Sequence, residues 1–380
     1  MKIAGLICEY NPFHYGHKYQ LNMIKQEFDA VVCVMSGSFV QRGDAAVYDK
    51  WSRAKAALLN GADLVLELPV RFSLSSAQDF AKGAVEILDK TGVIDSLCFG
   101  SECTDIEKLI YTAEIMSNEP YAVSEKIREL MKNGISFPKA RETAYQDILD
   151  TDIISRPNNI LAVEYIAALK SIGSKITPSA FKRKAVGHHS SDTSGIYASA
   201  TTLRKKLKNG EDINPFTPFD FSGHERYDTD RLSSIFRYKL IYNGVSAFEG
   251  IRDMEPGLAE RFIKFADAGS LSDIIAAVKT KRYTQARLQR IALSAILGLK
   301  GGYRSPEYIR ILGMTETGRK ILSEMRTAAS LPVINKAADF KDSSINEDIL
   351  ATNIAALCAD RPILQNRDYT TSPIYLSRTY

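Results

Sequence analysis

Apolar and polar residues alternate along the first hundred positions in blocks of two lengths. Short, almost continuously apolar runs are typical of buried parallel strands, and longer runs with a helical period lie between them. This alternation predicts an α/β fold whose parallel sheet has right-handed crossovers, a Rossmann-like doubly wound sheet. The predicted strands are residues 2–8, 30–35, 63–68 and 93–99, and the predicted helices are residues 16–28, 47–60 and 75–91.

The pattern changes beyond residue 104. Residues 104–170 are mostly helical in period, residues 175–184 are extended, and residues 199–208 form a basic helix. A Pro- and Gly-rich stretch then indicates a boundary, after which the helical period dominates with few strand signals. The domains we expect are a catalytic α/β domain at 1–210, a linker at 211–223 and a mainly α-helical domain at 224–380.

The composition places few limits on the class of protein or on its partners. The 380 residues, 45% hydrophobic and 25% charged, suit an ordinary globular protein of two or three domains. No apolar run approaches membrane-spanning length, and the apolar start that ends at Glu9 is too short for a signal peptide, so we expect a cytoplasmic protein without a membrane partner. The five cysteines are expected to be reduced core residues. A net charge of +4 neither requires nor excludes a nucleic-acid partner.

The turn after the first strand carries the most informative polar residues, His14-Tyr-Gly16-His17. The free N–H groups and partial positive charge of a helix start receive phosphate. Two imidazoles there can donate to phosphate oxygens and stabilise the charge that grows as pyrophosphate leaves. Zinc binding is a poorer interpretation, because the chain has no Cys-x-x-Cys pair. We therefore expect no metal held by protein ligands.

Three further polar segments follow predicted strands or begin a helix. Ligands of open α/β sheets bind beyond the carboxyl ends of strands, so these segments can share one site. Each also has a plainer interpretation: a simple turn, a strand terminator, a helix N-cap or a solvated helix face. The segments are a loop suited to a small substrate (Ser36, Gly37, Arg42, Asp44), a small residue against which a nucleotide can lie (Gly100), and a triphosphate-binding set (Arg183 with Ser199, Thr201 and Arg204).

A basic stretch lies in the helical part. From Ile274 to Pro306 there is no Asp or Glu, and two tyrosines interleave with the cations. Phosphate contacts need such cations, and aromatic rings can stack on unpaired bases, so the stretch predicts RNA binding. The alternative is a core helix with a solvated basic side. The predicted RNA-binding residues are Lys279, Lys281, Arg282, Arg287 and Arg290.

Several of these segments together resemble a known family. His-x-Gly-His and Ser199-Ala-Thr-Thr-Leu-Arg204 resemble the two nucleotide signatures of the HxGH nucleotidyltransferase superfamily. Five segments, in order along the first ~205 residues, resemble the bacterial tRNA(Met) cytidine acetate ligases: residues 9–17, 34–43, 99–102, 157–161 and 198–201. That resemblance implies that ATP and acetate give acetyl-adenylate, whose acetyl group passes to N4 of the wobble cytidine of elongator tRNA(Met).

The resemblance also implies roles for individual residues. His14, His17 and Arg183 would neutralise charge during catalysis, with Mg²⁺ on the phosphates of ATP. One departure is His188-His189-Ser190, where the family tends to have Tyr-His-Asp, and Asp192 is the acid that could compensate. The implied ATP contacts are Ile7, Cys8, Glu9, Tyr10, Asn11, Pro12, Phe13, His14, Tyr15, Gly16, His17, Lys18, Tyr19, Gln20, Gly100, Asn158, Asn159 and Arg183.

Two other functions remain compatible with the residues. A nucleotidyltransferase of cofactor biosynthesis would use the same turn, but it does not need a helical half with an acid-free basic stretch. A nonenzymatic RNA-binding protein would not need an intact His14-x-Gly16-His17.

Overall fold

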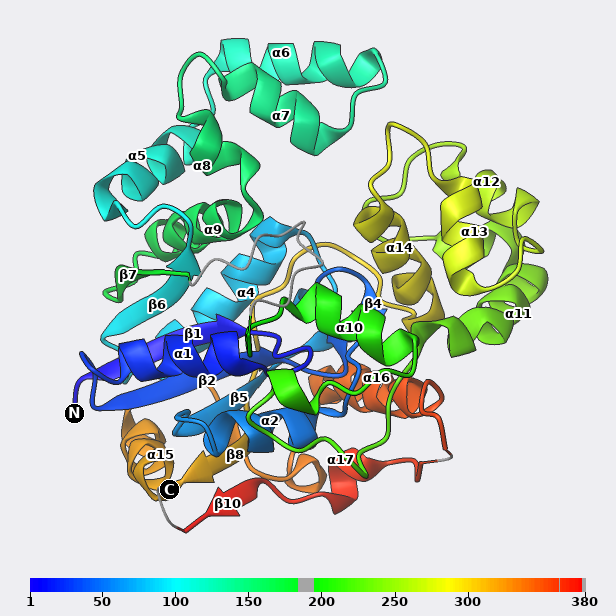
Figure 1. The fold of residues 1–380 in the computed structure, drawn as a ribbon. Helices are drawn as coiled ribbons and strands as arrows, with labels where there is room; N and C mark the ends of the chain where they lie inside the picture. Colours follow the sequence, from blue (N-terminus) through cyan, green and yellow to red (C-terminus); the bar gives the residue numbers. More distant parts are fainter. Residues whose placement is uncertain (184–194, 362, 378–380) are drawn as a thin grey trace.

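A single sheet forms the centre of the computed structural model, which describes residues 1–183, 195–361 and 363–377. Its strands run in the order β10-β8-β5-β2-β1-β6-β7, with β9 paired to β8 (Figure 1). Every pairing in this sheet is parallel except that of β5 with β8. The strands are β1 (Ile3–Cys8), β2 (Ala30–Ser36), β5 (Leu64–Leu68), β6 (Ser96–Ser101), β7 (Thr177–Lys182), β8 (Ile309–Thr315), β9 (Val333–Ile334) and β10 (Ile374–Leu376).

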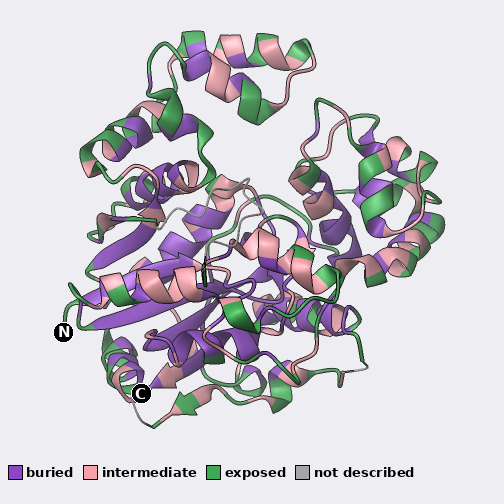
Figure 2. Cartoon of the chain, viewed as in Figure 1, coloured by how far each residue is buried: buried purple, intermediate pink, exposed green. Residues whose placement is uncertain are grey.

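Helices cover both faces of the sheet, because alternate side chains of each strand point to opposite sides. Ala4 and Leu6 of β1 pack in one core with α1 (Tyr15–Ile24) and α2 (Lys50–Leu58). Ile3 and Ile7 face the opposite core, which contains α4 (Ala77–Lys90), α9 (Pro157–Ser171) and α15 (Glu316–Ala328). Figure 2 shows the central strands β1, β2, β5 and β6 largely buried between these layers, whereas the edge strands β7 and β10 are partly exposed.

The seven elements predicted within the first hundred residues are all present, and the predicted parallel sheet is confirmed. The predicted helix 16–28 ends earlier, at Ile24, and the predicted strand 93–99 begins later, at Ser96. The loop after β2 contains a small hairpin that was not predicted, β3 (Phe39–Val40) with β4 (Asp44–Ala45), and a short helix α3 (Val70–Ser73) follows β5. Residues 104–170 are helical as predicted, with α5 (Ile106–Ser117), α6 (Tyr121–Lys132), α7 (Phe137–Tyr145) and α8 (Thr151–Ser155) before α9.

A second helical region follows α10 (Ala200–Lys208). The rings of Phe236, Phe248 and Phe262 pack together in its core, which also takes in Phe39 of β3 and Ala45 of β4. No helix in the described part of the chain combines the length and the apolar content needed to cross a bilayer. The elements are η1 (Asn214–Phe216), η2 (Thr229–Leu232), α11 (Ser233–Asn243), η3 (Gly244–Phe248), α12 (Leu258–Lys264), α13 (Leu271–Val278) and α14 (Gln285–Leu297).

The last third of the chain is mainly helical, as predicted, but it also adds strands to the central sheet. β8 pairs antiparallel with β5, and β9 and β10 pair with β8. The chain therefore leaves the sheet for the helical region and then returns to it. The division into domains stays a prediction. The remaining elements are η4 (Ala337–Asp339), η5 (Ser343–Ile345), α16 (Asn346–Ala356) and α17 (Arg367–Thr370).

A buried group of charges anchors this return. Lys50 Nζ lies 2.7 Å from Glu67 Oε1 and 2.7 Å from Asp368 Oδ1. Arg310 Nη1 of β8 lies 3.2 Å from Glu67 Oε2 and 2.5 Å from Asp368 Oδ1. Although burial alone would raise it, Lys50 and Arg310 lower the pKa of Asp368 to about 2. Two cations and two anions thus balance one another where α2, β5, β8 and α17 meet.

Candidate active site

The carboxyl ends of β1 and β6 frame the predicted site. From β1 the chain builds the sheet outward through β2 and β5, and then returns to add β6 on the other side of β1. Such a reversal of strand order is where open α/β sheets bind ligands. His14 follows β1 and begins α1, and Gly100 lies near the end of β6. The two segments predicted to hold the nucleotide therefore lie at the same edge of the sheet, on neighbouring strands.

His14 and His17 form the cap of α1. Nδ1 of His14 accepts a hydrogen bond from the Gly16 N–H at 3.0 Å, and Nδ1 of His17 accepts one from the His14 N–H at 3.3 Å. The two rings are stacked, with centroids 3.7 Å apart and planes 24° from parallel. A histidine pair thus satisfies two N–H groups that a helix start leaves unpaired.

Both imidazoles are neutral at physiological pH. Burial, followed by the charges of Arg183 and Arg204, lowers the pKa of His14 to about 3. Burial, followed by His14 and Arg183, lowers the pKa of His17 well below its usual value. Because each Nδ1 accepts a backbone N–H, the single proton of each neutral ring is on Nε2. The site therefore presents two preoriented Nε2–H donors rather than imidazolium cations.

The start of α10 brings a hydroxyl pair and an arginine to the same turn. Ser199 is the N-cap, and its Oγ accepts from the Thr202 N–H at 3.1 Å. Arg204 donates to the Asn11 carbonyl at 2.8 Å and to Thr201 Oγ1 at 3.2 Å. The predicted triphosphate-binding helix start is therefore tied directly to the histidine turn, although Ser199 also serves as an ordinary cap.

Gly100 lets the side chains of Arg183 and Gln20 approach the backbone of β6 closely. A Cβ at this position would lie 3.0 Å from Arg183 Cγ and 3.4 Å from Gln20 Nε2. Arg183 follows β7 directly, and its N–H donates to the Ser101 carbonyl at 3.3 Å. The guanidinium of Arg183 forms no hydrogen bond or ion pair with another described residue, so it is available to a ligand.

The loop predicted to hold the small substrate folds back over the end of β2. The Ser36 hydroxyl is buried and has no hydrogen-bond partner among the described residues. Arg42 is exposed. Burial, together with the nearby charge of Glu9, raises the pKa of Asp44 to about 6, in spite of Arg204. A buried hydroxyl without a partner and a carboxyl with a raised pKa are both typical of ligand sites.

Arg53 organises this loop and was not predicted. It is fully buried and donates to the backbone carbonyls of Glu9 (2.6 Å), Ser36 (3.0 Å) and Gly37. It therefore fixes the ends of β1 and β2 relative to each other. Its sequence signal was weak: a single cation on the inward face of the helix predicted at 47–60.

The chain is similar to known proteins along almost its whole length. The family described as HIGH Nucleotidyl Transferase matches residues 1–370. Curated relatives named tRNA(Met) cytidine acetate ligase include one from Thermoanaerobacter sp. (strain X514), 37% identical over 97% of this chain and 98% of that protein. The chain belongs to the HIGH nucleotidyl transferase family, among the tRNA(Met) cytidine acetate ligases. The resemblance drawn from the motifs is thereby confirmed.

Further relatives agree along the whole chain. The protein of that name from Clostridium perfringens (strain ATCC 13124) is 37% identical, with 98% of this chain and 99% of that one covered. The crystal structure of Thermotoga maritima TmcAL bound with alpha-thio ATP superimposes with a TM-score of 0.88 at 33% identity, covering 100% of both chains. The apo form of the same protein superimposes with a TM-score of 0.90.

Two asparagines predicted to contact ATP have other partners. Oδ1 of Asn159 accepts from the N–H groups of Glu102 (2.9 Å) and Cys103 (3.0 Å), and its amide donates to the Asp152 carbonyl at 3.1 Å. Asn158 donates to Glu102 Oε1 at 2.6 Å. Asn159 therefore holds the loop after β6, and the ATP contacts predicted for the two asparagines stay predictions.

The segment from Ile7 to Gln20 contains both buried residues and partly exposed residues. Ile7, Tyr10 and Phe13 are buried, and the rings of Tyr10 and Phe13 pack against His17 with centroids 4.9 and 5.6 Å away. Asn11 Oδ1 accepts from the Val47 N–H at 2.8 Å. Residues 188–192, where the chain departs from the family pattern, lie outside the described residues. The partly exposed residues of this segment are Cys8, Glu9, Tyr15, Gly16, His17, Lys18, Tyr19 and Gln20.

Most arginines of the basic stretch are bound within the protein. Glu255 pairs with Arg282 at 2.6 Å and with Arg287 at 2.9 Å. Arg287 also donates to the Asp253 carbonyl. Lys279 and Lys281 are exposed and form no ion pair with a described residue. The solvated cations available to RNA are thus fewer than the sequence indicates.

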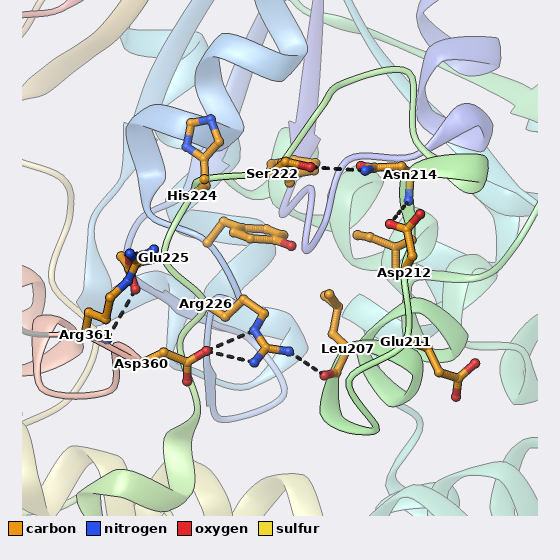
Figure 3. Close-up of a pocket in the computed structure, with 14 residues that line it drawn as sticks. Leu207, Glu211, Asp212, Asn214, Ser222, His224, Glu225, Arg226, Asp360 and Arg361 are labelled. Atoms are coloured by element: carbon orange, nitrogen blue, oxygen red, sulfur yellow. Dashed lines mark hydrogen bonds and ion pairs between the residues drawn. The ribbon is translucent and has the colours of Figure 1, made fainter.

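A cavity of about 270 Å³ lies away from this site, where the predicted linker meets the end of the chain (Figure 3). Its rim is joined by ion pairs between Arg226 and Asp360 (2.9 Å) and between Arg361 and Glu225 (2.6 Å). The linker packs onto the segment just before α2, where the ring of Phe221 stacks on that of Tyr48 with centroids 4.2 Å apart. These contacts join the predicted linker to the segment before α2 and to residues 360 and 361.

Proposed function

We propose that this protein is an ATP-dependent ligase that activates acetate as acetyl-adenylate and transfers the acetyl group to N4 of a tRNA cytidine. The observation that carries the proposal is the pair of neutral imidazoles at the start of α1, flanked by Arg183 and Arg204, in a member of this family. The wobble cytidine of elongator tRNA(Met) is the proposed acceptor, since relatives carry that name. A cytoplasmic location follows from a tRNA substrate.

In the first half-reaction a carboxylate oxygen of acetate attacks the α-phosphorus of ATP. The new P–O bond forms as the bond to the bridging oxygen of pyrophosphate breaks, so negative charge accumulates on the leaving group. The Nε2–H groups of His14 and His17 and the guanidinium of Arg183 are suited to receive that charge without reorganising. No covalent intermediate with the protein is needed.

In the second half-reaction the cytosine amine attacks the carbonyl carbon of the mixed anhydride. The bond between that carbon and the phosphate oxygen breaks, AMP leaves, and the amine loses a proton. A cytosine amine is a weak nucleophile, so the reactivity of the anhydride and the positioning of the base supply the acceleration.

Magnesium is proposed to enter with the phosphates. Mg²⁺ prefers oxygen ligands and keeps several waters, so one or two carboxylates beside the phosphates are enough to hold it. Within the described residues, no group of three His, Cys, Asp or Glu side chains gathers into a preformed metal site. Asp44 and Glu9, carboxylates near Arg204, are proposed as such ligands, which changes the expectation from the sequence that no protein group holds a metal. The ion would neutralise phosphate charge.

The tRNA is proposed to dock on the loop before α14. Lys279 and Lys281 are exposed there, so each can contact a backbone phosphate. Replacing both with glutamate should weaken tRNA binding and reduce its salt dependence by about two units of slope. If the double variant binds tRNA as the wild type does at both low and high salt, the RNA docks elsewhere on the protein.

One assay tests the whole proposal: the exchange of labelled pyrophosphate into ATP, with and without acetate, followed by mass spectrometry of tRNA(Met) nucleosides. Acetate-dependent exchange together with N4-acetylcytidine is the expected result. Exchange that needs a phosphorylated cofactor precursor would instead indicate a nucleotidyltransferase of cofactor biosynthesis. Absence of any exchange would indicate a nonenzymatic RNA-binding protein.

A further inference from the structure

The hairpin of β3 and β4, which carries Arg42 and Asp44, packs directly against α14. Gly43 at its tip has φ +84°, and its N–H donates to the Val40 carbonyl at 2.9 Å. A Cβ on Gly43 would lie 2.6 Å from Gln289 Cβ and 2.7 Å from the Arg290 backbone nitrogen. The hairpin backbone therefore touches the backbone of a helix about 250 residues later in the chain, which only glycine permits.

Two consecutive residues of α14 bond to the hairpin on either side of this contact. Gln289 Nε2 donates to Asp44 Oδ1 at 3.2 Å. Arg290 Nη1 donates to the Gln41 carbonyl at 3.3 Å. The hairpin is thus held at both arms by one turn of helix.

The opposite side of the hairpin faces the nucleotide turn. The Gln41 N–H donates to Glu9 Oε1 at 2.8 Å, and Glu9 lies between the end of β1 and the histidine turn. Asp44 interacts electrostatically with Arg204, which is bonded to Asn11. Gln41 and Asp44 therefore each have one partner on α14 and another beside the phosphate-binding residues.

The charged side chain of Arg290 is not exposed to solvent as an RNA-binding cation would be. Its side chain is only 12% exposed, and its nearest anion is Asp253, with Nη2 to Oδ2 at 3.8 Å. Its Nε is buried without a hydrogen-bond partner among the described residues. A side chain so enclosed can hold the loop against which it lies, whereas a phosphate backbone would need to reach it from solvent.

We propose that Gln289 and Arg290 are positioning residues for acetate activation: α14 holds the β3–β4 hairpin beside the nucleotide site, so the helical region takes part in the first half-reaction before any tRNA binds. This rests on the proposed function. It also replaces the RNA-binding role predicted for Arg290 from the sequence. Arg290 and Gln289 act through Gln41 and Asp44, and misplacement by about 1 Å can cost up to ~10²-fold in rate.

The variants to test this are Gln289→Ala and Arg290→Ala, with Arg290→Lys as the conservative variant. Gln285→Ala is the matched control, since Gln285 is an exposed residue of the same helix. In acetate-dependent pyrophosphate exchange without tRNA, both alanine variants should raise KM for acetate about tenfold, with a smaller change in KM for ATP. Arg290→Lys, which retains a donor, should recover part of the loss, and the control should match the wild type.

Amide hydrogen exchange of residues 36–46 supplies a second readout that does not depend on catalysis. Both alanine variants should speed exchange of the Gly43 N–H at least tenfold, while amides of β1 stay protected. Folded variants that keep the acetate KM within twofold, or whose hairpin amides are unchanged, would overturn the inference. If the wild type shows no acetate-dependent exchange, the proposed function fails, and the hairpin amides still decide whether α14 orders this loop.

Discussion

The two roles of His14, helix cap and phosphate donor, can be separated by substitution. Alanine removes both the Nδ1 that accepts from Gly16 and the Nε2–H that is proposed to donate to phosphate. Asparagine keeps an acceptor suited to an N-cap, but its amide is shorter than the imidazole. We therefore compare His14→Ala with His14→Asn, and both with His17→Ala.

The expected magnitudes differ for stability and for catalysis. Loss of the cap should cost His14→Ala about 1 kcal/mol in the free energy of unfolding, whereas His14→Asn should lose only a few tenths. Removing one preorganised donor to a developing charge costs about 10²–10³-fold in kcat, so both variants should lose that factor in adenylate formation. Because the two rings stack at 3.7 Å, the double variant with His17→Ala should fall short of the product of the single losses.

The lowered pKa of His14 adds a pH test. Its folded-state pKa of about 3 lies below the unfolded value near 6.5, so the unfolded chain binds the extra proton and stability falls as pH decreases below 6.5. Between pH 6.5 and 5 the wild type should lose about 2 kcal/mol of unfolding free energy through His14, and His14→Asn should abolish that loss.

Urea unfolding at several pH values and pyrophosphate exchange at pH 7.5 measure these effects. Normal adenylate formation in His14→Asn and His17→Ala would remove the pair from the mechanism. An equal pH dependence of stability in wild type and His14→Asn would contradict the neutral imidazole.

Three further predictions concern other parts of the site and its support. Asp44 has a folded-state pKa of about 6, above its unfolded value, so its ionisation destabilises the fold as pH rises through that range. In urea unfolding, Asp44→Asn should therefore gain about 1–3 kcal/mol of unfolding free energy at pH 7.5 and nothing at pH 3. An unchanged stability at pH 7.5 would refute this. Gly100→Ala should displace Arg183 and raise KM for ATP several-fold in the exchange assay without lowering Tm, and an unaltered KM would show that the nucleotide lies elsewhere. Asp368→Asn should lose about 3–5 kcal/mol of unfolding free energy because Lys50 then lacks one of its two buried anions, and a loss under 1 kcal/mol would mean that the cluster is already solvated.

The sequence predicted the first hundred residues well because their strands are locally distinctive. A buried parallel strand is apolar on both faces, so β1, β2 and β5 stand out from the helices between them. The same reasoning missed β8. Its run contains Arg310, and that charge is buried only because Glu67 and Asp368 neutralise it, partners that no local pattern reveals.

The candidate site shows the same limit. The histidine turn and Gly100 were found because the turn joins β1 to α1 and Gly100 lies near the end of β6. The RNA-binding role of the basic stretch stays a prediction, and its ion pairs were not foreseen, since cations can be counted along a chain but their partners cannot. Glu255 precedes the acid-free stretch and neutralises Arg282 and Arg287 across space. Arg53 was overlooked because its partners are backbone carbonyls, which leave no trace in composition.

The late return of the chain to its sheet has a consequence for synthesis in the cell. β5 is complete at Leu68, but its antiparallel partner β8 begins only at Ile309. At about 5–20 residues per second, the ribosome leaves this apolar strand as an open edge for roughly 10–50 s. Open apolar edges recruit other chains, and an inward-pointing charge is one of the devices that discourage it. Glu67 lies within β5, and during that interval only Lys50 of its two cationic partners has been made.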